Sequence, residues 1–274
     1  MPPQKYIFFA WAPYTEHERD LVQPDFSATY DLTSDIPATL GLWGTGTWPK
    51  EPATVDVWLG IVSNATTADS KKHGKKKVTV SFFEDDCDAA LRAYVQQLMQ
   101  VVQVASYGSC LRNADHPAVK KDAEARRLHS RADPEHKLQE ARLQAARGSM
   151  FCLVVDRMDA VNFLSQSLSM AFAAGCVPVY YGTGQANMMA PHHSFVNAHA
   201  LQSARRLGSS LRSLAADGAA YSKFHEWRQY VGKSVNYRDY LENSLFFLSC
   251  HICERLAEES QSISGRESHA YALR

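Results

Sequence analysis

Short apolar runs that alternate with amphipathic stretches dominate the pattern of this chain. Residues 150–155 (MFCLVV) form a continuous apolar run, which is typical of a parallel strand covered on both faces. Between Asp88 and Val102 the apolar residues recur at helical spacing, and residues 163–182 supply a further helix followed by the strand CVPVYYG. Strands that alternate with helices predict an α/β fold with a doubly wound parallel sheet.

Other segments extend this pattern at both ends. We expect strands at residues 5–11, 26–36 and 102–108, and three helical segments over residues 201–258. Residues 115–148 are charged and rich in alanine, which indicates an exposed helix.

The middle of the chain contains an expected boundary between two units. Residues 37–54 are rich in Pro, Gly, Thr and Trp and are interpreted as a connecting loop. The apolar run at residues 55–64 (VDVWLGIVSN) contains β-branched residues and predicts the first strand of a second unit. The lysine-rich segment 71–77 is interpreted as a solvated loop insertion rather than a phosphate-binding patch, because no aromatic residues interleave with it.

Ligands of doubly wound sheets bind at the carboxyl ends of the strands. The pattern therefore places a candidate cleft around Ser63, Ser106, Asp156 and Gly182. Serines at strand ends are mostly turn formers, so this prediction concerns a location and not a reaction.

Composition narrows the class of protein. The chain has 274 residues, 45% of them hydrophobic, which suffices for one large α/β domain or two small ones. Its formal net charge of zero argues against recruitment by nucleic acid or an acidic membrane surface. No run of about 18 apolar residues predicts a membrane span, and the first residues do not form a convincing signal peptide.

Six cysteines permit disulfides without requiring them. Cys250 and Cys253 lie three residues apart, and no second pair of metal ligands accompanies them. A local disulfide or two thiols that pack in a helix is therefore preferred to a zinc site. Asn64 begins an N-glycosylation sequon, which matters only in a lumenal protein.

Several fragments, in order, resemble the α1,3-fucosyltransferase family. They are FSATYDLTSDI, WLGIVSN, RAYVQQLMQVVQVASYGSCLRN, AFAAGCVPVYYGTGQANMMAPHHSFVNA, FHEWR and CHICERL, and they span about residues 5–258. The resemblance implies a B-type glycosyltransferase fold of two Rossmann-like halves, the amino-terminal one incomplete. Residues 1–54 would belong to the acceptor-side half and residues 55–232 to the half that binds GDP-fucose, and residues 233–274 would form a helix returning towards the first half.

The resemblance also implies an activity. Family members transfer L-fucose, with inversion, from GDP-fucose to a hydroxyl of N-acetylglucosamine in glycans or glycoproteins, in α1,3 linkage. The implied location is the Golgi lumen, with a membrane anchor that this chain lacks. No metal cofactor is obligatory in this reading, and no nucleic acid is involved.

The donor-binding residues implied by the resemblance follow the strand MFCLVV. Asp156 and Arg157 stand where the family has Glu and Asn, and Phe163 stands at a family Tyr. Gln166 replaces the Glu that holds ribose hydroxyls, and Ser167 replaces the Lys that holds the diphosphate. Both charges of the family's Glu and Lys are therefore missing at these two positions. The guanidinium of Arg157, at the same strand end, is suited to binding a phosphate group.

Two further assignments come from neighbouring motifs. Arg92 lies one residue beyond the place of the family's diphosphate-binding Arg, which on a helix is a rotation of about 100°. The family's catalytic carboxylate is replaced by Trp11, so Glu16 is the candidate general base, with solvated charge as the alternative. His192 and His193, in the PHHSFVN turn, are expected to be structural.

Two other functions remain open from the sequence. One is a catalytically impaired relative of the same fold that binds a nucleotide or a partner protein. The other is a soluble cytosolic binding module with free thiols.

Overall fold

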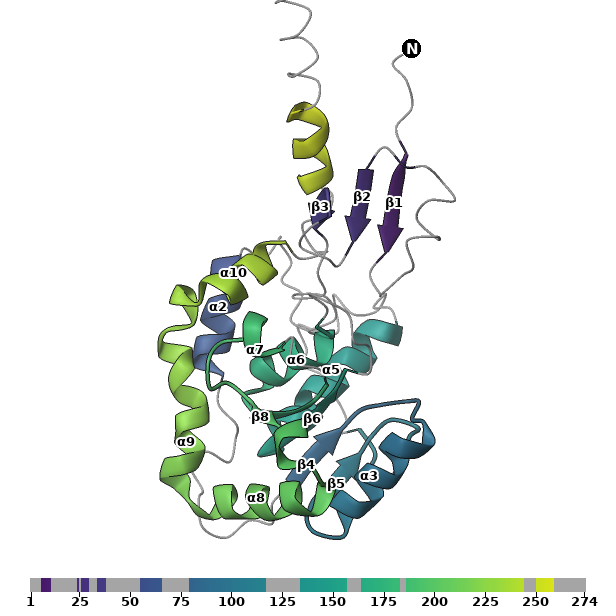
Figure 1. Ribbon diagram of the computed structural model, residues 1–274, viewed down its shortest axis with the longest axis vertical. Helices are drawn as coiled ribbons and strands as arrows, with labels where there is room; N and C mark the ends of the chain where they lie inside the picture. The colour runs from purple at the N-terminus through teal and green to yellow at the C-terminus, as the bar shows by residue number, and fades with distance from the viewer. Residues whose placement is uncertain are drawn as a thin grey trace, which may run out of the picture.

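Two parallel sheets organise the structure (Figure 1). Their arrangement agrees with the predicted α/β fold of two Rossmann-like units. The computed structural model describes residues 6–10, 24, 26–29, 34–37, 55–65, 79–116, 134–156, 164–182, 186–243 and 250–258.

The larger sheet has five strands in the order β5-β4-β6-β7-β8, and every pair is parallel. The order reverses between β4 and β6, which makes their carboxyl ends the switch point of a doubly wound sheet. The strands are β4 (Thr79–Phe82), β5 (Gln103–Ser106), β6 (Phe151–Val155), β7 (Val177–Tyr181) and β8 (Val196–Asn197).

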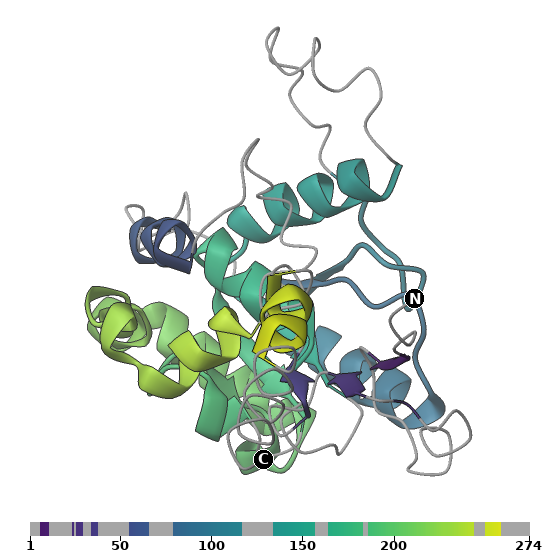
Figure 2. The same ribbon diagram turned by 90° about the horizontal axis from the view of Figure 1, so that it is seen from above.

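Helices cover both faces of this sheet, as the apolar runs of β6 and β7 predicted (Figures 1 and 2). One face carries α3 (Ala89–Met99) and α8 (Ala204–Ala216), which contact each other. The other carries α2 (Val55–Asn64), α5 (Pro134–Arg147) and α6 (Gln166–Ala174). Two separate apolar cores result, one on each face.

Local sequence explains where the central helices begin and end. Asp88 caps α3 by accepting a hydrogen bond from the backbone N–H of Leu91 at 2.8 Å. Leu91, Val95 and Leu98 then face the core at helical spacing, as predicted. Helix α6 ends at Gly175, whose φ of 80° is the left-handed conformation that favours glycine.

The smaller sheet contains β1 (Ile7–Ala10), β2 (Phe26–Thr29) and β3 (Ile36–Pro37), paired in parallel in that order. Strands were predicted at residues 5–11, which contain β1, and at residues 26–36, which contain β2 and the start of β3. A helix at residues 250–258 lies beside this sheet (Figure 1), and its Ile252 packs against Phe26. The remaining elements are α7 (Ala186–Met189), η2 (His199–Leu201), α9 (Gly218–Glu226), η3 (Trp227–Gln229), η4 (Val231–Lys233) and α10 (Val235–Glu242).

The strand predicted at residues 55–64 is wrong, because this segment is helix α2. Val55, Leu59 and Val62 are buried at i, i+4 and i+7, so one face of a helix contacts the core. A short apolar run does not distinguish a buried strand from a buried helix by its pattern alone. The first strand of the larger sheet is instead β4, which the sequence analysis did not identify.

The helix expected within residues 115–148 is confirmed as α5, but it is not fully exposed. Leu143 and Ala146 are buried in the core, where α5 contacts α6. The predicted loop at residues 37–54 and the lysine-rich segment 71–77 lie outside the described residues.

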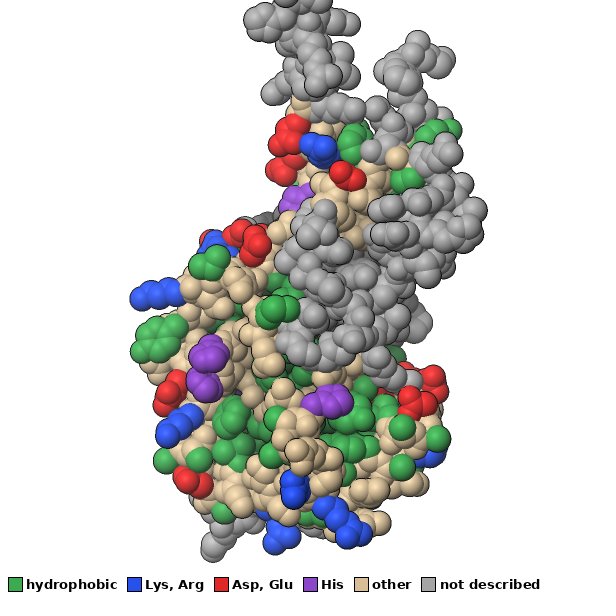
Figure 3. Space-filling view, viewed as in Figure 1, with side chains coloured by type: hydrophobic (Ala, Val, Ile, Leu, Met, Phe, Trp, Pro, Cys, Tyr) green, Lys and Arg blue, Asp and Glu red, His purple; other side chains and the backbone are tan. Residues whose placement is uncertain are grey.

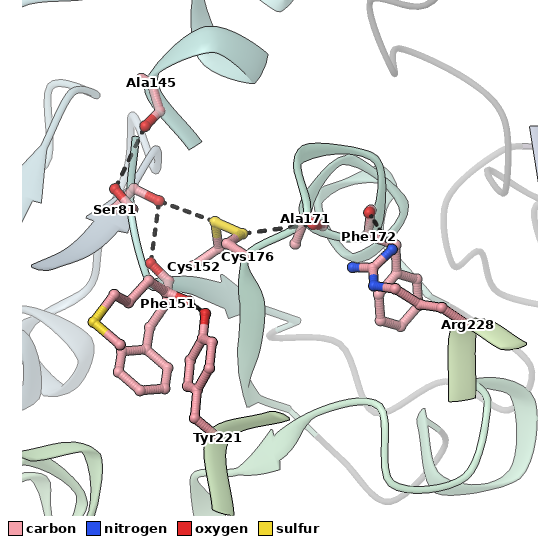
Figure 4. Close-up of a disulfide and its surroundings, with 11 residues drawn as sticks. Ser81, Ala145, Phe151, Cys152, Ala171, Phe172, Cys176, Tyr221 and Arg228 are labelled. Atoms are coloured by element: carbon pink, nitrogen blue, oxygen red, sulfur yellow. Dashed lines mark hydrogen bonds between the residues drawn. A yellow bond between two sulfur atoms is a disulfide. The ribbon is translucent and has the colours of Figure 1, made fainter. Parts of the chain in front are cut away.

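Disulfides join Cys87 to Cys110 and Cys152 to Cys176, and Figure 4 shows the second of them. Of the two alternatives for Cys250 and Cys253, the local disulfide is wrong: both are free thiols on the helix at residues 250–258, and both are exposed rather than packed.

One buried arginine links two helices, α2 and α6. Arg228, from the FHEWR motif, donates hydrogen bonds to the backbone oxygens of Val62 in α2 and Phe172 in α6 (Figure 4 shows the latter). Its guanidinium also lies 4.7 Å from the centre of the Trp227 ring. Because Arg228 binds carbonyls near the carboxyl ends of two helices, its positive charge interacts favourably with the negative ends of both helix dipoles.

Within the described part of the chain, no helix combines the length and apolar character that crossing a membrane requires.

Candidate functional site

The switch point of the larger sheet contains a cavity of about 270 Å³. Residues 83–86, which follow β4, form one wall, and Gln139 and Arg142 of α5 form another. Gln166 and Ser167, in the first turn of α6, and Met170 further along the same helix complete the described lining. The position is where doubly wound sheets bind their ligands, outside the carboxyl ends of adjacent strands.

The first turn of α6 brings together two residues that the sequence analysis singled out. Gln166 and Ser167 both line the cavity, and Ser165 precedes them as the residue that begins the helix. The side-chain oxygen of Gln166 is buried and has no hydrogen-bond partner among the described residues. The amino end of a helix attracts anions, because its first N–H groups point outward and its dipole is positive there.

Asp156 follows β6 directly and is only 4% exposed. Its Oδ2 accepts a hydrogen bond from the backbone N–H of Ser165 at 3.3 Å, and its Oδ1 makes none within the described part of the chain. Burial raises the pKa of the carboxyl, which the neighbouring Ser165 and Tyr180 groups partly oppose. The residue therefore holds the start of α6 in place and is shielded from solvent.

Two buried tyrosines surround this carboxyl. Tyr240 of α10 donates from its hydroxyl to the backbone oxygen of Leu164 at 3.0 Å. Burial and the charge of Asp156 raise the pKa of Tyr180, and burial is also the main cause of the raised pKa of Tyr240. Both hydroxyls thus remain neutral at physiological pH, and Tyr240 anchors the segment that leads into α6.

Arg142 is a residue of this cavity that sequence reasoning missed. Its Nη2 lies 2.8 Å from Oδ2 of Asp85, and 16% of its side chain is exposed. Its Nε is buried without a hydrogen-bond partner in the described ranges. Gln139, Leu143 and Ala146 recur at helical spacing, and the structure buries all three. Arg142 shares this face of α5, so the spacing is the sequence signal that could have placed it on the inner side of the helix.

Aromatic rings continue the wall beyond β4. Phe83 stacks on Tyr107 with ring centres 5.2 Å apart, and Tyr107 stacks on His116 at 5.3 Å. Burial lowers the pKa of His116, and the positive charge of Arg142 lowers it further. His116 is therefore neutral at pH 7. Of the two arginines that act on it, Arg142 and Arg112, only Arg142 lines the cavity among the described residues.

The structure places other predicted residues elsewhere. Arg92 is exposed on α3, on the opposite face of the sheet from α6, and it does not line the cavity. Ser63 is exposed within helix α2, so its predicted place at a strand end is wrong. Ser106 and Gly182 do follow or end strands, and both are buried.

Three of the candidate residues, Glu16, Arg157 and Phe163, lie outside the described residues. Asn64 is exposed at the end of α2, and its side-chain nitrogen donates to the backbone oxygen of Gly60 at 2.8 Å. Cationic side chains gather over α8 at the lower edge of Figure 3, and none of its arginines lines the cavity. Among the described residues, no three His, Cys, Asp or Glu side chains form a group that could hold a metal ion.

Relatives of known activity match much of this chain. An α-(1,4)-fucosyltransferase of Arabidopsis thaliana is 24% identical over 70% of the chain and 48% of its own length. An α-(1,3)-fucosyltransferase B of Drosophila melanogaster is 23% identical over 84% of the chain and 49% of its own length. Human GDP-fucose protein O-fucosyltransferase 3 is 26% identical over 74% of the chain and 39% of its own length. The chain thus spans about half the length, or less, of these relatives.

Among solved structures, an α1,3-fucosyltransferase crystallised with GDP-fucose matches with a TM-score of 0.43 and 13% identity, over 82% of each chain. A family model described as "Glycosyltransferase family 10 (fucosyltransferase) C-term" matches residues 71–269, which include every strand of the larger sheet and the whole described lining of the cavity. The chain therefore belongs to glycosyltransferase family 10, the fucosyltransferases.

Proposed function

We propose that this chain provides the donor-binding part of a fucosyltransferase that moves L-fucose from GDP-fucose to a sugar hydroxyl with inversion. The observation that carries the proposal is the cavity at the β4–β6 switch point, with the first turn of α6 on its lining. Family membership and the fucosyltransferase relatives support the same donor.

The chemistry needs groups that stabilise the leaving diphosphate. The amino end of α6 contributes N–H groups and a positive dipole there. The amide of Gln166 supplies neutral hydrogen bonds to ribose hydroxyls, and Asp156 holds the helix start in position. Arg157 and Phe163 are proposed to contact the donor. Arg92 would contact it only if the bound donor extends across the edge of the sheet.

The acceptor and the compartment are proposed from the family. The acceptor is a GlcNAc hydroxyl of a glycan or glycoprotein, the linkage is α1,3, and Glu16 is the general base. Two disulfides favour an oxidising compartment, in agreement with the Golgi lumen. Asn64, exposed at the end of α2, is the proposed glycosylation site.

A second function has its own observation. Gln166 and Ser167 are uncharged where the family resemblance places a Glu and a Lys. Loss of one charge-stabilising donor typically costs on the order of 10²–10³ in rate. A nucleotide-binding relative without turnover is therefore the alternative.

Titration calorimetry with GDP, followed by a transfer assay with GDP-fucose and GlcNAc-terminated glycans, separates these functions. Transfer together with a GDP Kd below about 1 mM, or −4 kcal/mol, supports the enzyme. Binding without transfer supports the second function, and weaker binding rejects both. The double variant Gln166→Glu/Ser167→Lys should bind GDP more tightly, and unchanged affinity would show that these positions do not contact the donor.

A further inference from the structure

We infer that Arg142 binds the diphosphate of the donor, in the role that Ser167 is unable to fill. The inference rests on the proposed function, because it assigns a residue to the same cavity. It adds a contact from α5, a helix that none of the quoted family motifs includes.

The position of Arg142 carries the first step. Its side chain lines the switch-point cavity together with Gln166 and Ser167, the first two residues of α6. An anion drawn to the amino end of α6 would therefore share the cavity with this guanidinium. A planar guanidinium also matches two phosphate oxygens at once, which a serine hydroxyl does not.

The hydrogen bonds of Arg142 carry the second step. Nη2 is held by Asp85 at 2.8 Å, and Asp85 in turn accepts from the backbone N–H of Ser109 at 3.1 Å. The guanidinium is thus held from one side. Its buried Nε makes no hydrogen bond in the described part of the chain, which is unusual because buried polar groups are nearly always paired. The guanidinium thus keeps hydrogen-bonding capacity that the described residues do not use, and a phosphate in the cavity would meet the part of the side chain that is exposed.

Charge carries the third step. Glu84, Asp85 and Asp86 form one wall of the cavity, so a diphosphate there meets carboxylates of the same sign. His116, next to that wall, has a pKa lowered by burial and carries no charge at pH 7. Arg142 is the cation among the described lining residues, so its charge reduces the repulsion that these carboxylates exert on an anion.

The test compares three variants by titration with GDP and GMP at low and physiological salt. Arg142→Gln should weaken GDP binding at least tenfold and reduce the ratio of GDP to GMP affinity. Asp85→Asn breaks the same ion pair but keeps the cation and removes a repelling carboxylate, so it should tighten GDP binding a few-fold. Arg147→Gln, in the last turn of α5 and outside the lining, should bind as the unmodified protein does.

The outcomes separate this inference from the proposed function. If the unmodified protein binds no GDP, both are overturned. If it binds GDP and Arg142→Gln binds equally well, only the role of Arg142 is overturned. Equal losses in Arg142→Gln and Asp85→Asn would also overturn it, because the ion pair would then act as a structural brace. Thermal melting of each variant, compared with Arg147→Gln, identifies losses that come from unfolding.

Discussion

Arg228 donates from Nη1 to the backbone oxygen of Phe172 at 3.1 Å, within the core beneath the candidate site. The same nitrogen donates to the backbone oxygen of Val62, so one buried cation joins α6 to α2. Burial lowers the pKa of Arg228 to about 10, which still leaves it charged at neutral pH. The helix whose first turn lines the cavity is therefore held at its other end by this residue.

Replacing Arg228 with Lys should destabilise the fold. An ammonium group lacks the planar fork that reaches both carbonyls, and hydrogen bonds to charged groups contribute about 1.5–3 kcal/mol each. We expect a loss of about 3 kcal/mol in the free energy of unfolding, measured by urea titration. Arg112→Lys is the control, because its ion pair with Asp115 is exposed and should change stability by less than about 1 kcal/mol. Equal stability of both variants would contradict the structural role of Arg228.

Asp156 should make stability depend on pH in the acidic range. Its pKa is raised in the folded protein above the ordinary value of 3.8, so the folded state keeps a proton that the unfolded state has lost. The contribution of this group is therefore greatest below pH 3.8 and decreases as the pH rises towards the folded pKa. Asp156→Asn removes that decrease and still offers an oxygen to the N–H of Ser165.

Urea unfolding between pH 4 and 7 measures this effect. The free energy of unfolding of Asp156→Asn should decline less with rising pH than that of the unmodified protein. Asp115→Asn, at an exposed site, should leave the slope unchanged. A slope that is identical in the Asp156→Asn variant would show that the carboxyl ionises normally.

The cysteines should differ in reactivity. Alkylation of the folded, unreduced protein should modify Cys250 and Cys253, which are exposed, and should spare the four cysteines in disulfides. Peptide mass spectrometry identifies the modified residues. Alkylation of Cys152 or Cys176 without a reductant would contradict the observed pairing.

Removing the Cys152–Cys176 disulfide should cost stability. The bond closes a segment with a sequence separation of 24 residues, for which loop entropy predicts about 3 kcal/mol. The double variant Cys152→Ala/Cys176→Ala should lose that much in urea unfolding. Cys250→Ala/Cys253→Ala, which removes two exposed thiols, is the matched control.

Gly108 should tolerate no side chain. A Cβ at this residue would lie 2.1 Å from the backbone oxygen of Glu84, on the loop that forms a wall of the cavity. Gly108→Ala should therefore displace that wall, weaken GDP binding and cost at least about 1–3 kcal/mol of stability. Gly60→Ala is the control, because a Cβ at Gly60 meets nothing within 4 Å and alanine favours helix α2 by up to about 1 kcal/mol.

Local sequence predicted much of the larger sheet. Continuous apolar runs identified β6 and β7, and helical spacing identified α3 and its buried residues. The same rules were wrong for residues 55–64, because an apolar run of ten residues fits either a buried strand or a buried helix. Packing decided between them, since Val55, Leu59 and Val62 contact the core only when they share one helical face.

The candidate site was determined in part by sequence. The family resemblance, and not the pattern of strands and helices, singled out Gln166 and Ser167. They line the cavity because a helix that follows a parallel strand starts at the carboxyl edge of the sheet. Arg142 and Asp85 are 57 residues apart, and no local pattern relates them. Only the parallel pairing of β4 with β6 brings their loops and helices together, and with them the charge that the sequence near Ser167 lacks.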